Sequence, residues 1–337
     1  MPDAILHADA VSAGYGGGRH PRLVLHEVDL EVLPGQAVGV VGESGSGKST
    51  LAKVLVGQLR AAAGTVTLDG TDLGSLRGAA LRAARRRVQL VPQDPYGSLD
   101  PRMTVRRALT EAIDPEARRP GKYEGRVAEL LRTVALDPEV AGRYPHEFSG
   151  GQRQRIAIAR ALAVEPEVIV ADEVTSSLDA SVQAEILNLL RDIQSRTGVG
   201  MVFITHDLSV ANFICSRICV LYLGRVVESG PTDLLFQPDH PYTRLLVDSL
   251  PRASGELGDP SASAQEPADP AAPPSGCPFH PRCAARPDDP PARQRCAGER
   301  PLLLPRHLPG GDRSTACHFP LVAQADPTTS LNARLPR

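Results

Sequence analysis

The feature that most constrains the fold of this chain is one glycine-rich segment, Gly42-Glu43-Ser44-Gly45-Ser46-Gly47-Lys48-Ser49. An apolar run at residues 38–41 precedes it, and a helical pattern of apolar residues extends from 47 to 59. A strand, a G-x-x-x-x-G-K-[ST] loop and a helix, in that order, let backbone N–H groups and a helix N-terminus converge on phosphate. The alternative is a glycine-rich turn that only caps a helix.

The segment predicts how a bound nucleoside triphosphate and its metal ion are held. Lys48 can reach the β- and γ-phosphates, and the hydroxyl group of Ser49 can ligate Mg²⁺. The candidate nucleotide-binding residues here are Gly42, Ser44, Gly45, Ser46, Gly47, Lys48, Ser49 and Thr50.

Short apolar runs alternate with helical patterns over much of the chain. The runs expected to form buried strands are residues 38–41, 88–91, 168–171, 201–204 and 218–223. A helix is expected at residues 181–196, between the third and fourth of these runs. The alternation predicts parallel strands covered by helices, which is an α/β fold.

Two regions within residues 1–250 depart from this alternation. Residues 4–33 contain short runs at 23–25 and 28–33 with Gly and Pro punctuation, which predicts an antiparallel β subdomain. Residues 95–163 are mostly helical in pattern and rich in arginine, which predicts an inserted helical subdomain.

The composition changes after residue 250. Residues 251–275 are rich in Ala, Pro, Ser, Asp and Glu, which predicts an extended, flexible linker. A small Cys-rich C-terminal extension follows at 276–322, and residues 323–337 predict a frayed tail. With such a linker, we expect nucleotide binding by residues 1–250 to be largely independent of the extension.

The ends of the apolar runs supply the remaining parts of a nucleotide site. Asp172 and Glu173 end one run, so one carboxylate can hold the metal while the next acts as general base on water. His206 ends another run and can contact the γ-phosphate, and Gln93 can bring its amide to the metal or the water. Taken singly, the acidic pair can be a polar turn, the histidine can be structural, and the glutamine carries no signal.

Composition argues against other classes of function. The chain has 37 Lys+Arg against 39 Asp+Glu, a net charge of −2, and only 4% aromatic residues, so no nucleic-acid partner is expected. No apolar run approaches the roughly 18–20 residues that cross a bilayer, and no secretory signal is visible. We expect a protein that stays in the cytosol unless a partner holds it at a membrane.

The order of these motifs resembles the ATP-binding-cassette (ABC) ATPases. Residues 148–152, Phe-Ser-Gly-Gly-Gln, resemble the signature of that family and lie between Gln93 and Asp172. Residues 173–179 resemble the segment that joins the catalytic Glu to the D-loop, with Val174 where a proline is usual. Because position 174 is not a ligating position, the valine bears on the rigidity of the loop and not on its chemistry.

This resemblance implies a P-loop NTPase core that binds ATP with Mg²⁺ and hydrolyses it. Tyr15 matches the aromatic residue that stacks on adenine. The implied Mg²⁺ ligands are Ser49, Gln93 and Asp172. The implied catalytic residues are Glu173, His206 and Gln93.

The signature segment precedes a helical pattern at residues 153–163, and small residues at a helix N-terminus form an anion site. The resemblance implies that this site completes the ATP pocket of a facing subunit, so that two nucleotides lie between two ATPase subunits, identical or related. Its residues are Ser149, Gly150, Gly151 and Gln152.

Several segments resemble the oligopeptide/dipeptide importers within this family, namely residues 93–102, 240–246, 276–283 and 316–318. That resemblance implies the ATP-binding subunit of a peptide importer, held peripherally at the cytoplasmic face of the plasma membrane. The implied partners are a second ATPase subunit, two transmembrane permease subunits and, indirectly, an extracytoplasmic solute-binding protein. The alternatives are import of nickel or another solute, and a soluble cassette protein without transport.

The extension holds four of the six cysteines, Cys277, Cys283, Cys296 and Cys317. No C-x-x-C pair is present, so an ordinary zinc ribbon fits poorly, but four thiols can bind zinc or an iron–sulfur cluster. Resemblance to the peptide importers favours a 4Fe–4S cluster; with zinc, His280 or His318 would be among the ligands. Cys215 and Cys219 are expected to pack in the core.

Overall fold

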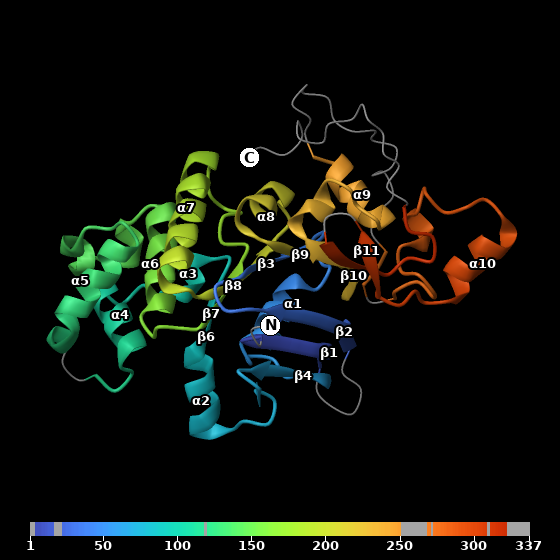
Figure 1. The fold of residues 1–337 in the computed structure, drawn as a ribbon. Coiled ribbons are helices and arrows are strands. Elements are labelled where there is room, and N and C mark those ends of the chain that lie inside the picture. The colour runs from blue at the N-terminus through green and yellow to red at the C-terminus, as the bar shows by residue number, and fades with distance from the viewer. Residues whose placement is uncertain are drawn as a thin grey trace.

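The computed structural model describes residues 4–16, 22–117, 120–250, 268–270, 272–308 and 311–321. The expected tail at 323–337 lies outside the described residues, as does most of the expected linker at 251–275. The described elements are arranged around two sheets (Figure 1).

The larger sheet has the strand order β11-β12-β10-β9-β3-β8-β7-β6 among the described residues. Its parallel strands are β9 (Arg217–Tyr222), β3 (Ala37–Val41), β8 (Gly200–Thr205), β7 (Val168–Asp172) and β6 (Val88–Val91). The predicted strands agree with these to within one residue at each end, so the α/β prediction is confirmed.

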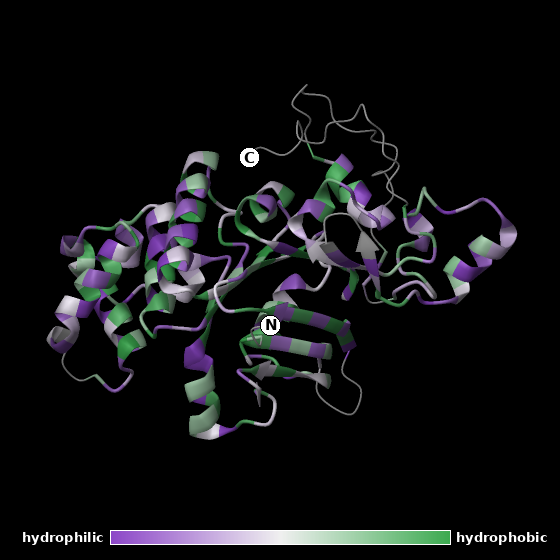
Figure 2. Ribbon diagram, in the orientation of Figure 1, coloured by the Kyte–Doolittle hydropathy of each residue, from purple (hydrophilic) through white to green (hydrophobic). Residues whose placement is uncertain are grey.

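Helices cover both faces of the parallel strands, which is why their sequences are nearly continuous apolar runs. One face packs in a buried cluster with α7 (Ala180–Thr197) and α8 (Leu208–Ile214), and the other with α1 (Lys48–Leu55). Figure 2 shows the hydrophobic residues concentrated along these strands. The helix predicted at 181–196 is α7.

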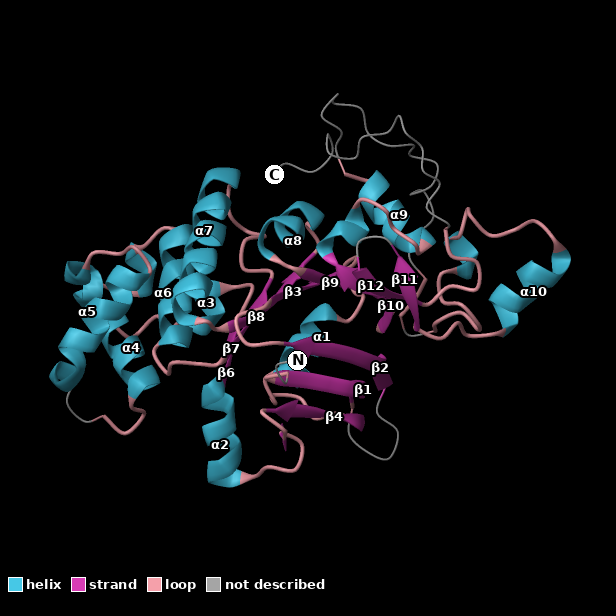
Figure 3. Ribbon diagram, viewed as in Figure 1, coloured by secondary structure: helices cyan, strands magenta, loops and turns pink. Residues whose placement is uncertain are grey.

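The smaller sheet is antiparallel and lies beside α1 (Figure 3). Its strands are β1 (Leu6–Tyr15), β2 (Arg22–Val32), β4 (Ala63–Leu68) and β5 (Thr71–Asp72), of which the sequence predicted neither β4 nor β5. The prediction of separate strands at 23–25 and 28–33 is wrong, because β2 spans both. Glu27 has a φ of 52° within β2, and its N–H donates to the Ser12 hydroxyl at 3.0 Å, so the strand continues through a local irregularity.

The region predicted as helical, 95–163, forms one end of the molecule (Figure 1). Its helices are α3 (Pro95–Ser98), α4 (Val105–Ile113), α5 (Glu124–Thr133) and α6 (Gly150–Leu162), and α2 (Gly78–Arg87) precedes β6. Leu109, Leu131 and Ile156 are completely buried, and they belong to the same apolar cluster as residues of the large sheet. Within the described part of the chain, no helix combines the length and apolar character that spanning a bilayer requires.

The C-terminal extension is part of the larger sheet. The strand β10 (Arg225–Pro231) pairs with β9 and with β12 (Gly311–Thr315), and β12 pairs with β11 (Leu304–Leu308). The remaining helices here are α9 (Pro241–Asp248) and α10 (Pro290–Gly298). Strand pairing therefore joins the extension to the sheet, which the sequence analysis did not predict.

Glu228 of β10 is completely buried where the sheet meets the residues before α9. Its carboxylate accepts hydrogen bonds from the backbone N–H groups of Asp239, at 2.8 Å, and His240, at 3.1 Å. Burial nevertheless raises the pKa of Glu228 to about 7, because loss of water disfavours the charged form more than these hydrogen bonds favour it.

We expect Glu228 to lower the free energy of unfolding as the pH rises from 4.5 to about 7. In that range its carboxyl group is ionised in the unfolded chain but still protonated in the folded one, so the folded state binds more protons. Glu228→Gln removes this contribution. Denaturant titrations across that range should therefore show a smaller loss of stability in the variant. An equal loss in both proteins would contradict the raised pKa, since all other titrating groups are shared.

Candidate functional site

The predicted phosphate loop connects β3 to α1 at the carboxyl edge of the parallel strands. Gly45 and Gly47 have φ angles of 79° and 106°, in the left-handed region that favours glycine. At Gly42, a Cβ atom would lie 2.2 Å from the carbonyl oxygen of Leu221, so only glycine fits. Ser44 and Gly45 are exposed at the tip of the loop, whereas the following residues up to Lys48 are buried.

Lys48 places its ammonium group across the loop. Its Nζ donates to the carbonyl oxygens of Gly42, at 2.8 Å, and Glu43, at 2.9 Å, and lies 3.8 Å from Oε1 of Glu173. Burial lowers the pKa of Lys48, and the nearby carboxylates partly offset this. The loop thus has a positive charge shielded from water, where it can interact strongly with phosphate oxygens.

Oxygen atoms from two elements meet beside the loop. Ser49 of α1 donates from its hydroxyl group to Oδ1 of Asp172 at 3.3 Å, and Asp172 is the last residue of β7. Burial raises the pKa of Asp172, and the bond from Ser49 opposes the rise. The buried Oγ of Ser46 has no partner among the described residues. A serine hydroxyl, a carboxylate and a glycine-lined loop fit a magnesium nucleotide.

Glu173 is the centre of a second group of predicted residues. Its Oε2 accepts from Nε2 of Gln93 at 3.0 Å, and its Oε1 lies 3.4 Å from Nδ1 of His206. Gln93 also donates to the hydroxyl group of Ser176, at 3.3 Å, which the sequence analysis did not single out. The structure therefore brings together the three residues predicted to be catalytic.

The backbone of Glu173 is strained. Its φ of 47° lies in the left-handed region, which costs a non-glycine residue roughly 1–2 kcal/mol. Its N–H donates to the carbonyl oxygen of Ile204 in β8 at 2.9 Å, and this bond helps to hold the conformation. Strain of this kind is concentrated at functional sites.

Tyr15 lies near the loop at the end of β1. Its hydroxyl group is 3.4 Å from the hydroxyl oxygen of Thr50, and Nζ of Lys53 is 5.8 Å from its ring centroid. Tyr15 is 46% exposed, so part of the residue is accessible to solvent. The assignment of Tyr15 to adenine remains a prediction.

The signature segment is at the N-terminus of α6, in the helical region. Ser149 and Gln152 bond with each other: Oγ of Ser149 accepts from the N–H of Gln152 at 3.3 Å, and Oε1 of Gln152 accepts from the N–H of Ser149 at 3.0 Å. A Cβ atom at Gly151 would lie 2.4 Å from Val182 of α7, so close helix packing requires glycine there. Ser149, Gly150 and Gln152 are exposed, which leaves this helix end open to a partner.

The four cysteines of the extension come from separate segments and gather together. All are free; Cys277 and Cys296 are buried, and the other two are partly buried. The pKa of Cys317 is raised to about 12, mainly by burial and to a smaller extent by the other three thiols. No group of three or more His, Cys, Asp or Glu side chains is arranged to hold a metal ion within the described ranges.

The two histidines considered as zinc ligands have other partners. A ring nitrogen of His280 is 2.9 Å from the carbonyl oxygen of Cys277, and one of His318 is 2.8 Å from that of Glu299. In each histidine the other ring nitrogen is not engaged by these contacts. Cys215 and Cys219 are buried in the core, as predicted.

The sequence analysis missed one contact of the loop. Arg282 of the extension donates two hydrogen bonds to the carboxylate of Glu43, at 2.8 and 2.9 Å. Glu43 occupies a variable position of the loop motif, and Arg282 lies 239 residues further along the chain. No local pattern links such residues, so no sequence signal could have paired them.

Family models match two parts of the chain. The model described as ABC transporter matches residues 25–176, and that described as oligopeptide/dipeptide transporter, C-terminal region, matches residues 227–289. The whole chain is similar to a "Probable peptide ABC transporter ATP-binding protein" of Sinorhizobium fredii, with 44% identity and 97% of that protein covered. A Brucella abortus protein named for peptide import and ATP binding is also 44% identical, with 94% of each chain covered.

Solved structures share the fold of the nucleotide-binding part. The chain resembles cbiO1 from Clostridium perfringens, part of an ABC transporter complex, with a TM-score of 0.62, 26% identity and coverage of 70% of this chain and 92% of that one. It also resembles an ATP-binding cassette dimer bound to ADP and phosphate, with a TM-score of 0.59, 32% identity and coverage of 67% and 98%.

Proposed function

This chain belongs to the ATP-binding proteins of ABC transporters, and we propose that it hydrolyses ATP to power peptide import through separate permease subunits. The ATPase part of the proposal rests on the convergence of Lys48, Gln93 and His206 on the carboxylate of Glu173, beside the phosphate loop. The transport part is supported by the match of residues 227–289 to the oligopeptide/dipeptide transporter region. In that role the chain would be peripheral, at the cytoplasmic face of the plasma membrane.

The residues around the loop would divide the work of hydrolysis. Lys48 would compensate the phosphate charge, while Ser49, Asp172 and Gln93 supply oxygen ligands to Mg²⁺. Glu173 would accept a proton from the attacking water, because its Oε1 lies only 3.8 Å from Nζ of Lys48 in the phosphate loop. His206, more than half exposed, would contact the γ-phosphate.

Lys48→Ala and Glu173→Gln should separate nucleotide binding from hydrolysis. Loss of the Lys48 charge should weaken ATP binding about 10- to 100-fold, since hydrogen bonds to charged groups are lost. Glu173→Gln should still bind ATP but hydrolyse it about 10²–10⁴-fold more slowly, because an amide cannot act as the base. Equilibrium ATP binding and phosphate release measure the two effects.

Glu185→Gln is the matched control, because Glu185 is an exposed carboxylate paired with Arg155 away from the loop. It should retain both activities. In vesicles that contain the permease subunits, peptide uptake should stop with Glu173→Gln and continue with Glu185→Gln. Rapid turnover by pure Glu173→Gln protein would exclude Glu173 as the base.

We propose that a second ATPase subunit completes each nucleotide site. The exposed N-terminus of α6 supports this, since its N–H groups and small residues can receive the phosphates of a nucleotide bound by a facing subunit. Release of phosphate would then open the pair, because the γ-phosphate joins the two surfaces.

Mixing two inactive variants can test the shared site. Ser149→Arg blocks the site that this chain offers to its partner, and Glu173→Gln disables the base of its own site. In a mixed dimer both changes fall in one composite site and the other is intact, so hydrolysis should reappear on mixing. If wild-type activity per molecule stays constant at dilutions where only monomer remains, the shared site is wrong.

We also propose that Cys277, Cys283, Cys296 and Cys317 hold one 4Fe–4S cluster. The influence of the other three thiols on the pKa of Cys317 supports this proposal, because such an influence requires the four side chains to lie near one another. When bound, the cluster would join the segments of a small extension through thiolate bonds.

Protein purified without oxygen should be brown and contain iron and acid-labile sulfide in near-equal amounts. A single Cys→Ser change at any of the four positions should remove most of the colour, because the thiolates act as a set. Cys215→Ser and Cys219→Ser are the matched controls and should keep it, since both thiols are in the core. Zinc without iron in anaerobic protein would replace the cluster with a zinc site.

A further inference from the structure

The C-terminal extension reaches the nucleotide site through one buried ion pair. The two terminal nitrogens of Arg282 donate to Oε2 and Oε1 of Glu43, at 2.8 and 2.9 Å. The Arg282 side chain is 5% exposed and that of Glu43 is 25% exposed. Two parallel bonds to one carboxylate fix its orientation as well as its position.

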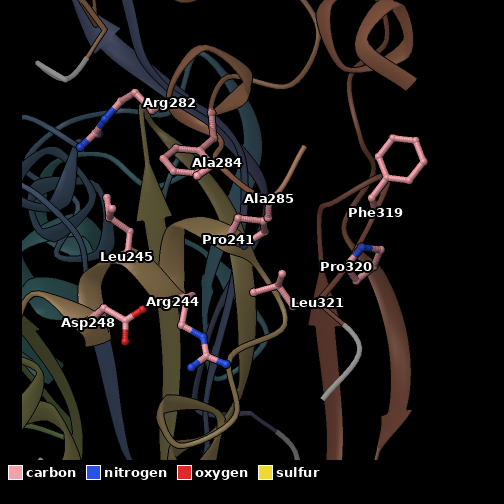
Figure 4. A pocket seen from close by; sticks show the side chains of 11 residues that line it. Pro241, Arg244, Leu245, Asp248, Arg282, Ala284, Ala285, Phe319, Pro320 and Leu321 are labelled. Carbon is pink, nitrogen blue, oxygen red and sulfur yellow. The ribbon is translucent and has the colours of Figure 1, made fainter. Parts of the chain in front are cut away.

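Aromatic rings hold the guanidinium group in place. It lies 5.8 Å from the ring centroid of Tyr222 at the end of β9 and 5.7 Å from that of Phe279 in the extension. These two rings pack edge to face, with centroids 5.4 Å apart. Figure 4 shows Arg282 at the edge of a groove of about 580 Å³, with its guanidinium group directed away from Phe319, Pro320 and Leu321. Arg282 is therefore fixed within the packed interior.

Glu43 is held at three points. Arg282 binds its carboxylate, its N–H donates to the hydroxyl group of Tyr242 in α9 at 2.9 Å, and its carbonyl oxygen accepts from Nζ of Lys48 at 2.9 Å. One loop residue thus touches both the extension and the lysine of the phosphate loop. Glu43 alone thus links Arg282 to Lys48 through these contacts.

We propose that Arg282 is a positioning residue for the ATP site, and that the Cys-bearing extension sets nucleotide affinity through its pair with Glu43. The inference rests on the assignment of residues 42–49 as the phosphate loop in the proposed function. Arg282 acts by fixing Glu43, the loop residue whose carbonyl oxygen accepts a hydrogen bond from Lys48. The extension then contributes to nucleotide binding, and it also adds the strands β11 and β12 to the larger sheet.

A purely electrostatic role for Arg282 predicts a different pattern. If Arg282 only neutralised Glu43 beside an anion site, Glu43→Gln would remove a repulsive charge and strengthen ATP binding. The double variant Arg282→Gln/Glu43→Gln would then bind ATP like the wild type. Positioning predicts weaker binding in all three variants, because each breaks the same pair.

The test measures the Kd for ADP, the KM and kcat for ATP, and the melting temperature of the full chain. Arg282→Gln and Glu43→Gln should each raise the ADP Kd and the ATP KM roughly tenfold, with a much smaller change in kcat. The double variant should be no worse than either single one, since the effects of a shared contact do not add. The charge exchange Glu43→Arg/Arg282→Glu should recover part of the loss.

Arg295→Gln is the matched control, because Arg295 pairs with Glu299 on the exposed side of the same extension. Its Kd and KM should remain those of the wild type. A lower melting temperature with unchanged Kd in Arg282→Gln would make the pair merely structural and overturn the proposal, as would tighter binding by Glu43→Gln. If Arg282→Gln does not fold, Glu43→Gln alone distinguishes the two roles. Weaker nucleotide binding by this variant supports positioning, and tighter binding contradicts it.

Failure of this inference is distinguishable from failure of the proposed function. If the wild type binds no nucleotide, or binds it equally well after Lys48→Ala, the assignment of the phosphate loop is wrong. If wild-type binding depends on Lys48 but the Arg282 and Glu43 variants bind normally, only the positioning role is wrong.

Discussion

The parallel direction of the buried strands determines where the functional residues can lie. Parallel strands end at a common edge, so residues distant in sequence meet there once the sheet forms. The phosphate loop follows β3, Asp172 ends β7, and Gln93 and His206 follow β6 and β8. Apolar burial on both faces fixes this sheet, and it thereby sets the distances around Glu173. The positions of the polar groups in the site are therefore determined first by the apolar packing of the sheet.

Much of this edge could be predicted because its signals are local. A run that is apolar throughout identifies a strand covered on both faces, and a polar residue at its end identifies the edge. The smaller sheet was harder, since Glu27 interrupts the pattern of β2 through a backbone conformation that the sequence does not report. The extension could not be placed at all: its pairing of Glu228 with Thr315, and of Arg282 with Glu43, joins residues that no spacing rule connects.

The extension contains few apolar residues of its own, and its packing explains how it is nevertheless ordered. The strand β12 pairs with β10 at Glu228 and Ser229, and Phe279 packs against Tyr222 and Tyr242, so the cassette supplies apolar contacts that the extension lacks. A segment stabilised in this way cannot change its fold without disturbing its support. The contact between Arg282 and Glu43 therefore makes coupling between the extension and the nucleotide site testable, where the sequence predicted independence.

The helical region and the C-terminal extension of one chain face two different nucleotide sites. The helical region exposes the start of α6, which we propose acts on a nucleotide held by another subunit. The extension acts inward, through Arg282 and Glu43, on the loop of its own chain. Arg282 directly precedes Cys283 in the sequence. Arg282 contacts Glu43, and Glu43 contacts Lys48, so these two residues connect the thiol segment to Lys48. Affinity for nucleotide would then be set within the chain, while closure of the site would require its partner.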